Sequence, residues 1–502
     1  MSTSSIQSEG RQKGGLSATD GPLRIRPAAV AGLFYPQSKK ALARQVDRLL
    51  SDAPEADASG LRALIVPHAG YDYSGPTAAC AYKLLAGRAY RTVIIMAASH
   101  YAEFTGVCVP AVAAYETPLG TVPVSPLARE LAGQKPFTTE PSGRVERPSW
   151  APPAPTHAAD TPETWEHSVE VQVPFLQRTL TDFAILPVVF GDAAPEAVAQ
   201  RLAPLVDEQT LVITSTDLSH YHAYDEAQAR DWQCVEAICA LDLERVKTQE
   251  ACGRMPVLAL LHLAKLKNWR ATLLDCRNSG DTAGDRRRVV GYAAIGFFDQ
   301  TATAVGGATE FSEVDRNFLL QLVRRTIRSV TSGGGLPEVP DSIVPAACRA
   351  ERGCFVTLTA HGRLRGCIGS LSADQPLPRA VAENARNAAL RDSRFSPVTA
   401  DEVDELHIEI SVLTEPRPLK FQSPDDLLAK LHPLLDGVVL KLGARRATFL
   451  PQVWEQLPDQ AEFLNHLSAK AGCAADAWRG PEVSVSTYRV EAFAEPGEED
   501  HA

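Results

Sequence analysis

The sequence predicts an α/β domain followed by an α+β domain, and three observations support this. At 502 residues the chain is too long for one ordinary hydrophobic core. Up to residue 298, short apolar runs alternate with segments of helical periodicity, which is typical of a parallel or mixed sheet flanked by helices. Beyond residue 310, strand-like runs dominate and helices are interspersed among them.

The composition of the chain argues against nucleic-acid binding and against a membrane protein. The charged fraction of 22% and the apolar fraction of 45% are typical of soluble globular proteins. A formal charge of −11 argues against nucleic-acid binding, which needs a basic surface. No run approaches the roughly 18 apolar residues that cross a bilayer, and the polar N-terminal stretch lacks the apolar segment of a signal peptide. The ten cysteines include no C-x-x-C pair, which favours reduced thiols. We therefore expect a cytoplasmic protein that binds neither nucleic acid nor membrane.

Composition also predicts the domain boundaries. We expect a disordered N-terminus over 1–22, a first domain over 23–298 with a Pro-rich exposed insertion at 136–165, a linker over 299–309, a second domain over 310–495 and an acidic tail over 496–502.

In the first domain, apolar spacing predicts each element in turn. Helices are expected over 39–50, 77–85, 166–180, 194–205, 226–243 and 256–267, and strands over 63–66, 92–96, 183–190, 211–214, 271–274 and 289–298. A tight turn is expected at 69–71, between the first strand and the second helix.

The second domain is expected to open with a helix that Ser312 caps together with Asp315. Strands over 354–360, 364–370 and 406–412 and helices over 378–390 and 451–470 follow. Clean alternation of apolar and polar residues marks the third of these strands as half-buried.

Three of the predicted strands of the first domain each lead into a histidine: His68, His100 and His220. Ligands of open α/β sheets bind just beyond the carboxyl ends of strands, so these side chains are candidates for an active centre. Imidazoles bind iron, copper and zinc, and a thiolate can complete a three-ligand set. We predict that His68, His100 and Cys252 hold one metal ion. Cys252 precedes a predicted helix, whose dipole favours the thiolate.

Four neighbouring residues are candidates either for supporting the metal ligands by hydrogen bonds or for proton transfer: Asp217 and His220 on one loop, and the adjacent pair Glu166 and His167. The alternative is that each histidine caps a strand or bonds a buried carbonyl without binding a metal. A further, metal-free alternative is nucleophilic catalysis by a cysteine with a histidine as base.

At these positions the sequence resembles the Memo family. The resemblance rests on PHAGY at 67–71, Ser99-His100, EHSVE at 166–170, the segment 217–220 and Cys252-Gly253-Arg254, and it covers about residues 26–298. It implies a fold similar to that of class III extradiol dioxygenases, which are non-haem iron enzymes. It also implies a metal between His68, His100 and Cys252, with Asp217 and His220 beside it.

One departure from those dioxygenases affects the expected chemistry. They bind iron(II) through two histidines and a carboxylate, whereas here a softer thiolate takes the place of the carboxylate. The resemblance therefore implies iron(II) or copper, with zinc ranked behind them. We expect a dioxygenase-like oxidoreductase acting on a small aromatic substrate. The alternative is a non-catalytic module that binds a metal or a peptide.

In the second domain, residues 363–370 (RLRGCIGS) are expected to form the end of a strand and a glycine-bracketed turn. Arg365 is a candidate for binding a carboxylate or phosphate, and Cys367 for a nucleophile or redox thiol. The alternative is that Cys367 is simply a small buried residue between two glycines.

This octapeptide, with the segments 384–397 and 447–454, resembles the AMMECR family over about residues 310–495. Members of the two families occur beside a radical SAM enzyme in the three-part AmmeMemoRadiSam system. The resemblance therefore implies a radical SAM enzyme as partner.

Overall fold

The computed structural model describes most of the chain. The described residues are 24–54, 58–139, 141–151, 160–299, 311, 313–339, 341, 343–371, 373–414, 416–481 and 483–495. The predicted disordered N-terminus, the acidic tail, nearly all of the predicted linker and the capping Ser312 lie outside them. Among the described helices none is long and apolar enough to cross a membrane.

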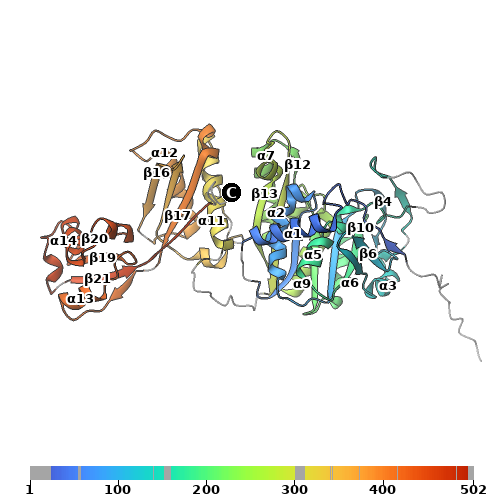
Figure 1. The fold of residues 1–502 in the computed structure, drawn as a ribbon, viewed down its shortest axis with the longest axis horizontal. Coiled ribbons are helices and arrows are strands. Elements are labelled where there is room, and N and C mark those ends of the chain that lie inside the picture. The colour runs from blue at the N-terminus through green and yellow to red at the C-terminus, as the bar shows by residue number, and fades with distance from the viewer. Residues whose placement is uncertain are drawn as a thin grey trace, which may run out of the picture.

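The first half is built on a nine-stranded mixed sheet, as expected for the α/β class (Figure 1). Its strand order is β12 (His220–His222), β14 (Val289–Asp299), β2 (Leu61–Val66), β11 (Thr210–Ser215), β3 (Thr92–Ala98), β10 (Ala184–Phe190), β5 (Val107–Cys108) and β8 (Phe137–Thr138), with β13 (Trp269–Asn278) paired to β14. Strands β2, β11, β3 and β10 run parallel, so their carboxyl ends share one edge. These four strands are almost fully buried, which explains their continuous apolar sequences.

Helices cover both faces of this sheet. One apolar core joins the sheet to α1 (Lys39–Asp52), α2 (Tyr71–Tyr82) and α5 (Val173–Thr179). The other joins it to α6 (Pro195–Leu202), α7 (Tyr224–Cys239) and α9 (Arg254–Lys267). Successive strand residues alternate between the two cores: Ile65 belongs to the second, and Leu64 and Val66 to the first.

Two local predictions in this half were wrong. The predicted turn at 69–71 contains the start of α2, which begins at Tyr71 with Gly70 as N-cap, six residues before the predicted helix. The segment 136–165 is not simply an exposed insertion. It contributes β8 to the main sheet and β9 (Gly143–Val145), which pairs with β4 (Ala102–Phe104). Its buried Glu163 accepts a hydrogen bond from Arg24 at 2.6 Å. The proline-rich composition of the segment gave no indication of these strands or of the Glu163 hydrogen bond.

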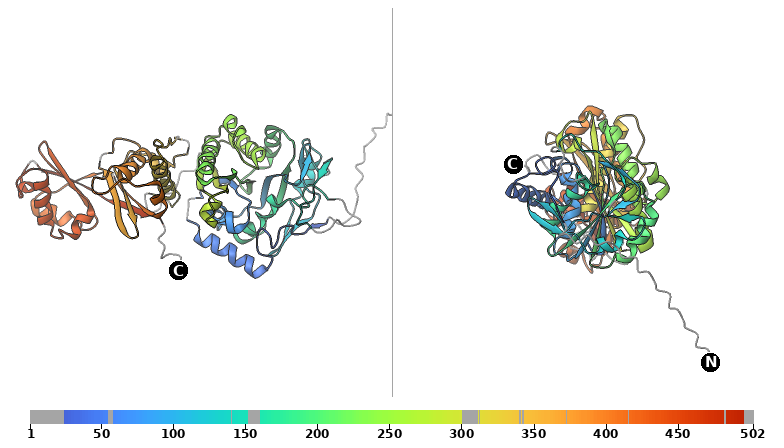
Figure 2. Two further views of the ribbon diagram at one scale, coloured as in Figure 1. Left: turned by 90° about the horizontal axis from the view of Figure 1, so that it is seen from above. Right: turned by 90° about the vertical axis from the view of Figure 1, so that its right-hand side faces the viewer.

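The second half is α+β, as predicted, and contains two four-stranded antiparallel sheets (Figure 2). The first has the order β16 (Arg363–Ser370), β15 (Cys354–Ala360), β17 (Leu406–Leu413) and β22 (Val490–Ala494), and α11 (Glu313–Thr331) and α12 (Leu377–Leu390) pack against it. The second has the order β18 (Arg417–Leu419), β21 (Val483–Tyr488), β19 (Gly437–Leu442) and β20 (Arg445–Phe449), with α13 (Pro424–Lys430) and α14 (Gln460–Lys470) in the same core.

Helix α11 joins the two halves. It lies beside β13 of the first half, as Figure 1 shows, and its buried residues Phe318 and Leu319 belong to the same apolar core as Trp269 of that strand. Polar contacts also cross the junction, because Arg286 of the first half donates to Asp404 and Arg328 of the second half donates to Tyr224 Oη at 3.0 Å. The junction is therefore a packed interface.

Candidate metal centre

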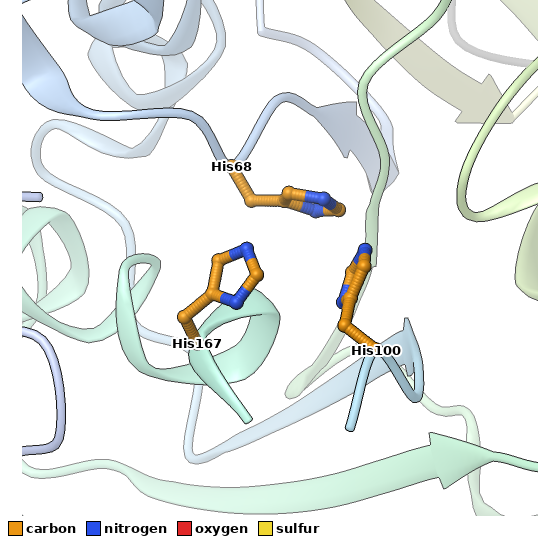
Figure 3. Close-up of side chains that lie close together, drawn as sticks. All are labelled: His68, His100 and His167. Carbon is orange, nitrogen blue, oxygen red and sulfur yellow. The ribbon is translucent and has the colours of Figure 1, made fainter. Parts of the chain in front are cut away.

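Three histidines meet at the carboxyl edge of the central strands. His68 follows β2, His100 follows β3, and His167 is the first residue of the short helix α4 (His167–Glu170). Their ring centroids are separated by 5.0 Å (His68 to His100), 5.3 Å (His68 to His167) and 4.7 Å (His100 to His167). One nitrogen from each ring lies within 4.8 Å of the others, and the rings point toward a common centre (Figure 3).

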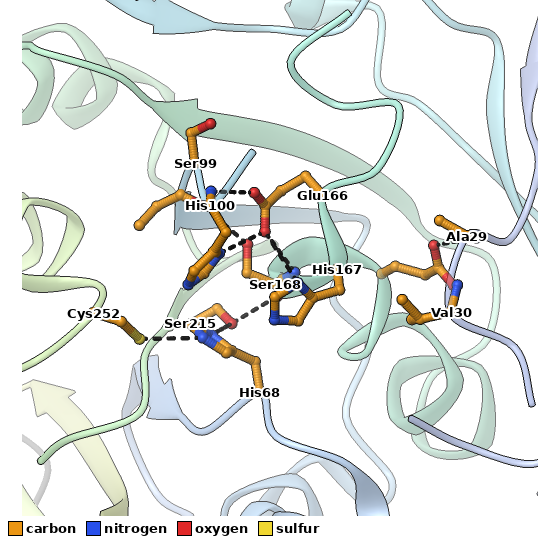
Figure 4. A network of polar contacts seen from close by, with 12 residues as sticks. Ala29, Val30, His68, Ser99, His100, Glu166, His167, Ser168, Ser215 and Cys252 are labelled. Carbon is orange, nitrogen blue, oxygen red and sulfur yellow. Dashed lines mark hydrogen bonds and ion pairs between the residues drawn. The ribbon is translucent and has the colours of Figure 1, made fainter. Parts of the chain in front are cut away.

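The polar neighbours of His68 define its tautomer. Ser215 Oγ donates its one hydrogen to the carbonyl of Ser168 at 2.7 Å, so it must accept from His68 Nδ1, which lies 2.9 Å away. His68 therefore carries its proton on Nδ1 and has a lone pair on Nε2. That nitrogen lies 3.1 Å from Cys252 Sγ (Figure 4). Burial and the charges of nearby histidines lower the pKa of His68 well below its usual value, which favours the neutral ring that ligates metals.

A buried carboxylate orients His100. Glu166 Oε1 lies 2.8 Å from His100 Nδ1, and Oε2 accepts the main-chain N–H of His100 at 2.6 Å. Burial alone would lower the pKa of His100, but Glu166 and Cys252 together outweigh burial and raise that pKa to about 11. The same pairing holds the pKa of Glu166 below its usual range in spite of burial. This is the carboxylate–histidine arrangement common beside metals, with His100 Nε2 turned toward Cys252, where a bound metal would take the place of the Nε2 proton.

Glu166 was predicted either to support a ligand or to transfer protons, and its contacts with His100 favour the supporting role. Besides holding His100, its Oε1 caps α4 by accepting the N–H of Ser168 at 3.0 Å.

The next residue, His167, is buried against Phe34, with ring centroids 4.6 Å apart. Its Nδ1 has no hydrogen-bond partner among the described residues. Burial lowers the pKa of His167 to about 4, so the ring is neutral and can act as a ligand.

Cys252 reaches the site on the loop before α9. Its Sγ accepts the N–H of Asp217 at 3.2 Å. The following Gly253 permits this close approach, because a Cβ there would lie 2.7 Å from the carbonyl oxygen of Ser215.

Asp217 in turn accepts the N–H of His68 at 2.8 Å. Burial raises the pKa of Asp217 to about 6. His220 begins β12 at the half-buried rim, where Glu250 accepts its main-chain N–H at 3.0 Å.

The donor set fits a metal ion. Metal bonds of about 2.0–2.3 Å to nitrogen and sulfur place neighbouring ligand atoms about 3–4 Å apart. The 3.1 Å separation of His68 Nε2 and Cys252 Sγ lies in this range, and the histidine nitrogens within 4.8 Å need only small side-chain movements. Two sets are available, His68 and His100 with either Cys252 or His167. The sequence indicated the first set and gave His167 a different role.

Two residues that support His68, Ser215 and Gln172, were not predicted from the sequence. Ser215 ends β11, and Gln172 donates to its Oγ at 2.8 Å from between α4 and α5. A serine one position before the loop that carries Asp217 was the available signal for a histidine partner. Nothing in the sequence marked Gln172, because its contact depends on how α4 packs against the sheet.

Cys367 lies elsewhere, in the second half. The strand predicted over 364–370 is confirmed as β16, and the turn expected around Cys367 was wrong, because residues 363–370 all belong to that strand. Gly366 faces α12, where a Cβ would lie 2.2 Å from the carbonyl oxygen of Ala388. The glycine therefore permits close helix packing, where the sequence had suggested approach by a ligand. Arg365 is held by Glu402 at 3.1 Å and by the carbonyl of Ser396 at 2.8 Å.

Among the described residues, no histidine contacts the Cys367 sulfur to act as a base for nucleophilic catalysis. Its Sγ accepts from Thr357 at 3.3 Å, and its main-chain N–H donates to Asp392 at 2.9 Å. His361, the histidine nearest to Cys367 in the sequence, lies in the turn before β16 and pairs with Glu405 at 3.3 Å.

Comparison with known proteins assigns both halves. The model of the Memo-like protein family matches residues 26–296, and that of AMMECR1 matches residues 320–493. MEMO1 family proteins of Nitrosopumilus maritimus and Methanosarcina acetivorans are 32% and 35% identical, each over 54% of this chain and 99% of its own length. The crystal structure of the uncharacterized protein PH0010 of Pyrococcus horikoshii is 31% identical over 38% of this chain and 96% of that chain, with a TM-score of 0.34. The chain therefore belongs to the Memo family and carries an AMMECR1 domain after its Memo domain.

Proposed function

We propose that the Memo domain is a metal-dependent redox enzyme with dioxygenase-like chemistry. The observation that carries this is the pair of oriented imidazoles. Ser215 and Glu166 hold the Nδ1 atoms of His68 and His100, so that both Nε2 atoms are turned toward Cys252 near His167. Such preorganisation is typical of metal ligands held by a second layer of hydrogen bonds.

Iron(II) or copper fits this donor set best. Imidazoles suit both metals, and thiolate adds affinity for copper(I), with zinc as a third candidate. When bound, the metal would supply one-electron or oxygen chemistry. The chain itself supplies a buried carboxyl for proton transfer, since Asp217 has a pKa near 6 and lies beside His68. His220 is the candidate proton relay at the rim.

The residues beside the site support a small aromatic substrate. The Tyr101 ring lies 6.3 Å from His100 and 5.8 Å from His167, and Trp150 packs edge-on against Tyr101 at 6.0 Å. Flat aromatic side chains of this kind can stack on a substrate ring. The fusion of an AMMECR1 domain to the Memo domain supports a shared task for the two, and we propose a radical SAM enzyme as their partner.

A second candidate is a catalytically silent module that binds a metal or a peptide. It is favoured by Cys252, because a fourth strong ligand beside three histidines would fill positions that oxygen and substrate need.

Oxygen uptake separates the two. We expect iron(II)-loaded protein to consume oxygen with catechol-type substrates, and the His68→Ala variant to lose this activity. A protein that binds iron or copper tightly through His68 but consumes no oxygen would support the silent module. A protein that binds no metal would contradict the enzyme and the metal-binding form of the silent module, and would leave only peptide binding.

A further inference from the structure

We propose that helix α7 connects the AMMECR1 half to the candidate metal centre, with Arg328 and Asp231 as positioning residues at the two ends of this connection. Helix α7 contacts helix α11 of the second half, and it also contacts the loop 217–220, which carries the proton-transfer candidates Asp217 and His220. In Figure 1, α7 and β12 lie on the side of the first half nearer to α11. The proposal rests on the proposed function only for the chemical task of that loop.

The contact with the loop comes from Asp231, two turns along α7. Its Oδ1 accepts the main-chain N–H of Ser219 at 2.8 Å, and both residues are buried. A Cβ on Gly291 of β14 would lie 1.9 Å from Asp231 Oδ2, so this glycine leaves room for the carboxylate. Gly291 also donates its N–H to the carbonyl of Ser219 at 2.9 Å and accepts the N–H of Leu218 at 2.8 Å. One helix and one strand therefore fix the loop immediately before His220.

The contact with the second half begins at Tyr224, the first residue of α7. Arg286 and Arg328 both lie over its ring, with their guanidinium carbons 4.4 Å and 4.8 Å from the ring centroid. Arg328 also donates to Tyr224 Oη at 3.0 Å, and Asp404 accepts hydrogen bonds from both arginines. Residues of the second half thus hold the start of α7, directly after the strand β12 that begins with His220.

A second contact from α11 lies beside Asp231. The guanidinium carbon of Arg325 is 4.4 Å from the ring centroid of Trp232, the residue after Asp231, and Arg325 lies 3.8 Å from Glu236 on the next turn. Arginine–aromatic contacts at Tyr224 and Trp232 therefore join α11 to about two turns of α7. A helix is stiff over this length, so a shift of α11 moves Asp231 together with Tyr224.

The loop is part of the candidate metal centre, because Asp217 accepts the main-chain N–H of His68 at 2.8 Å. Arg325, Arg328 and Asp404 lie within the residues that the AMMECR1 family model matches, whereas the candidate metal ligands all belong to the first half. The AMMECR1 half thus orders the proton-transfer loop from outside the site, and release of its contacts with α7 loosens that loop.

The test is hydrogen exchange of the amides of 217–222 in the full chain without metal, followed by mass spectrometry. Asp231→Ala should speed this exchange about three- to tenfold, because the Ser219 N–H loses its acceptor. Asp231→Asn keeps Oδ1 as an acceptor and should stay within about twofold of wild type. Arg328→Gln should speed the same amides about threefold, and the amides of 99–101 and 363–370 should not change.

A double variant and a matched control show whether α7 carries the effect. Arg328→Gln combined with Asp231→Ala should exchange no faster than Asp231→Ala alone, since both act through one helix. Arg379→Gln, which removes an exposed arginine paired with Glu383 within α12, should exchange as wild type.

Three results would overturn the proposal: wild-type exchange in Arg328→Gln, acceleration spread equally over 99–101 and 363–370, or multiplied effects in the double variant. The measurement needs neither metal nor oxygen. Failure of this connection would therefore leave the proposed metal chemistry standing, and a protein without metal would leave the connection intact.

Discussion

The histidine site and strand β16 each place a cysteine among polar side chains. They differ in whether those side chains keep atoms that could bind a metal or a substrate. Around Cys252, the partners of His68 and His100 occupy Nδ1 and leave both Nε2 atoms turned toward the sulfur, where a metal could bind between them. Around Cys367, the polar contacts hold the strand to its neighbours, and Arg365 is engaged by Glu402. A motif is able to perform chemistry when packing leaves some of its polar atoms unused.

Metal loading is the strongest way to test this contrast. With Zn²⁺ at a thousand times its Kd, a folded-state ligand adds about 4 kcal/mol of stability. We expect amides of 67–70, 99–101 and 252–254 to gain protection in hydrogen exchange, and those of 363–370 to remain unchanged. The same experiment on His100→Ala should show no gain. Protection centred on β16 would show that the metal binds near Cys367 and not at the histidine site.

The orienting role of Glu166 predicts the next largest effect. Glu166→Gln should lower metal affinity about 10- to 100-fold, because the carboxylate that orients His100 becomes a neutral amide. Titration with Zn²⁺ measures the loss. Glu196→Gln, at the exposed start of α6, is the control and should bind as wild type. Unaltered affinity in Glu166→Gln would show that His100 does not depend on its carboxylate.

Gly366 tests the packing of β16. Gly366→Ala should destabilise the AMMECR1 half by about 1–3 kcal/mol, because the new methyl would meet the carbonyl of Ala388. Urea unfolding measures this effect. Gly335→Ala, where nothing lies within 4 Å, should be close to neutral. If Gly366→Ala were as stable as wild type and weakened binding of some ligand, the glycine would serve recognition after all.

The two cysteines should give the smallest effect on stability and the clearest difference in reactivity. We expect bound metal to slow alkylation of Cys252 by iodoacetamide and to leave Cys367 unaffected. Cys367→Ser should change stability by less than about 0.5 kcal/mol. Metal-dependent protection of Cys367, or fast alkylation of Cys252 that metal does not change, would argue for thiol chemistry over metal binding.

Much of the fold could be predicted from sequence, because buried parallel strands such as β2 and β3 carry continuous apolar runs and end in histidines. The strand β15 was predicted with its observed bounds. Features set by long-range packing could not be predicted. The 363–370 segment was predicted as a strand, yet its two glycines also suggested a turn, and only the approach of α12 explains why Gly366 lies within the strand. For the same reason His167 was assigned to proton transfer, since its position beside His68 depends on where α4 packs.

The most direct test of the account is the metal content of anaerobically purified protein, measured by mass spectrometry for wild type, His100→Ala and the exposed-site control His466→Ala. We predict about one iron, copper or zinc per chain in wild type and in His466→Ala, and little in His100→Ala. Wild-type protein without metal, or His100→Ala with the same content as wild type, would contradict the proposed metal centre.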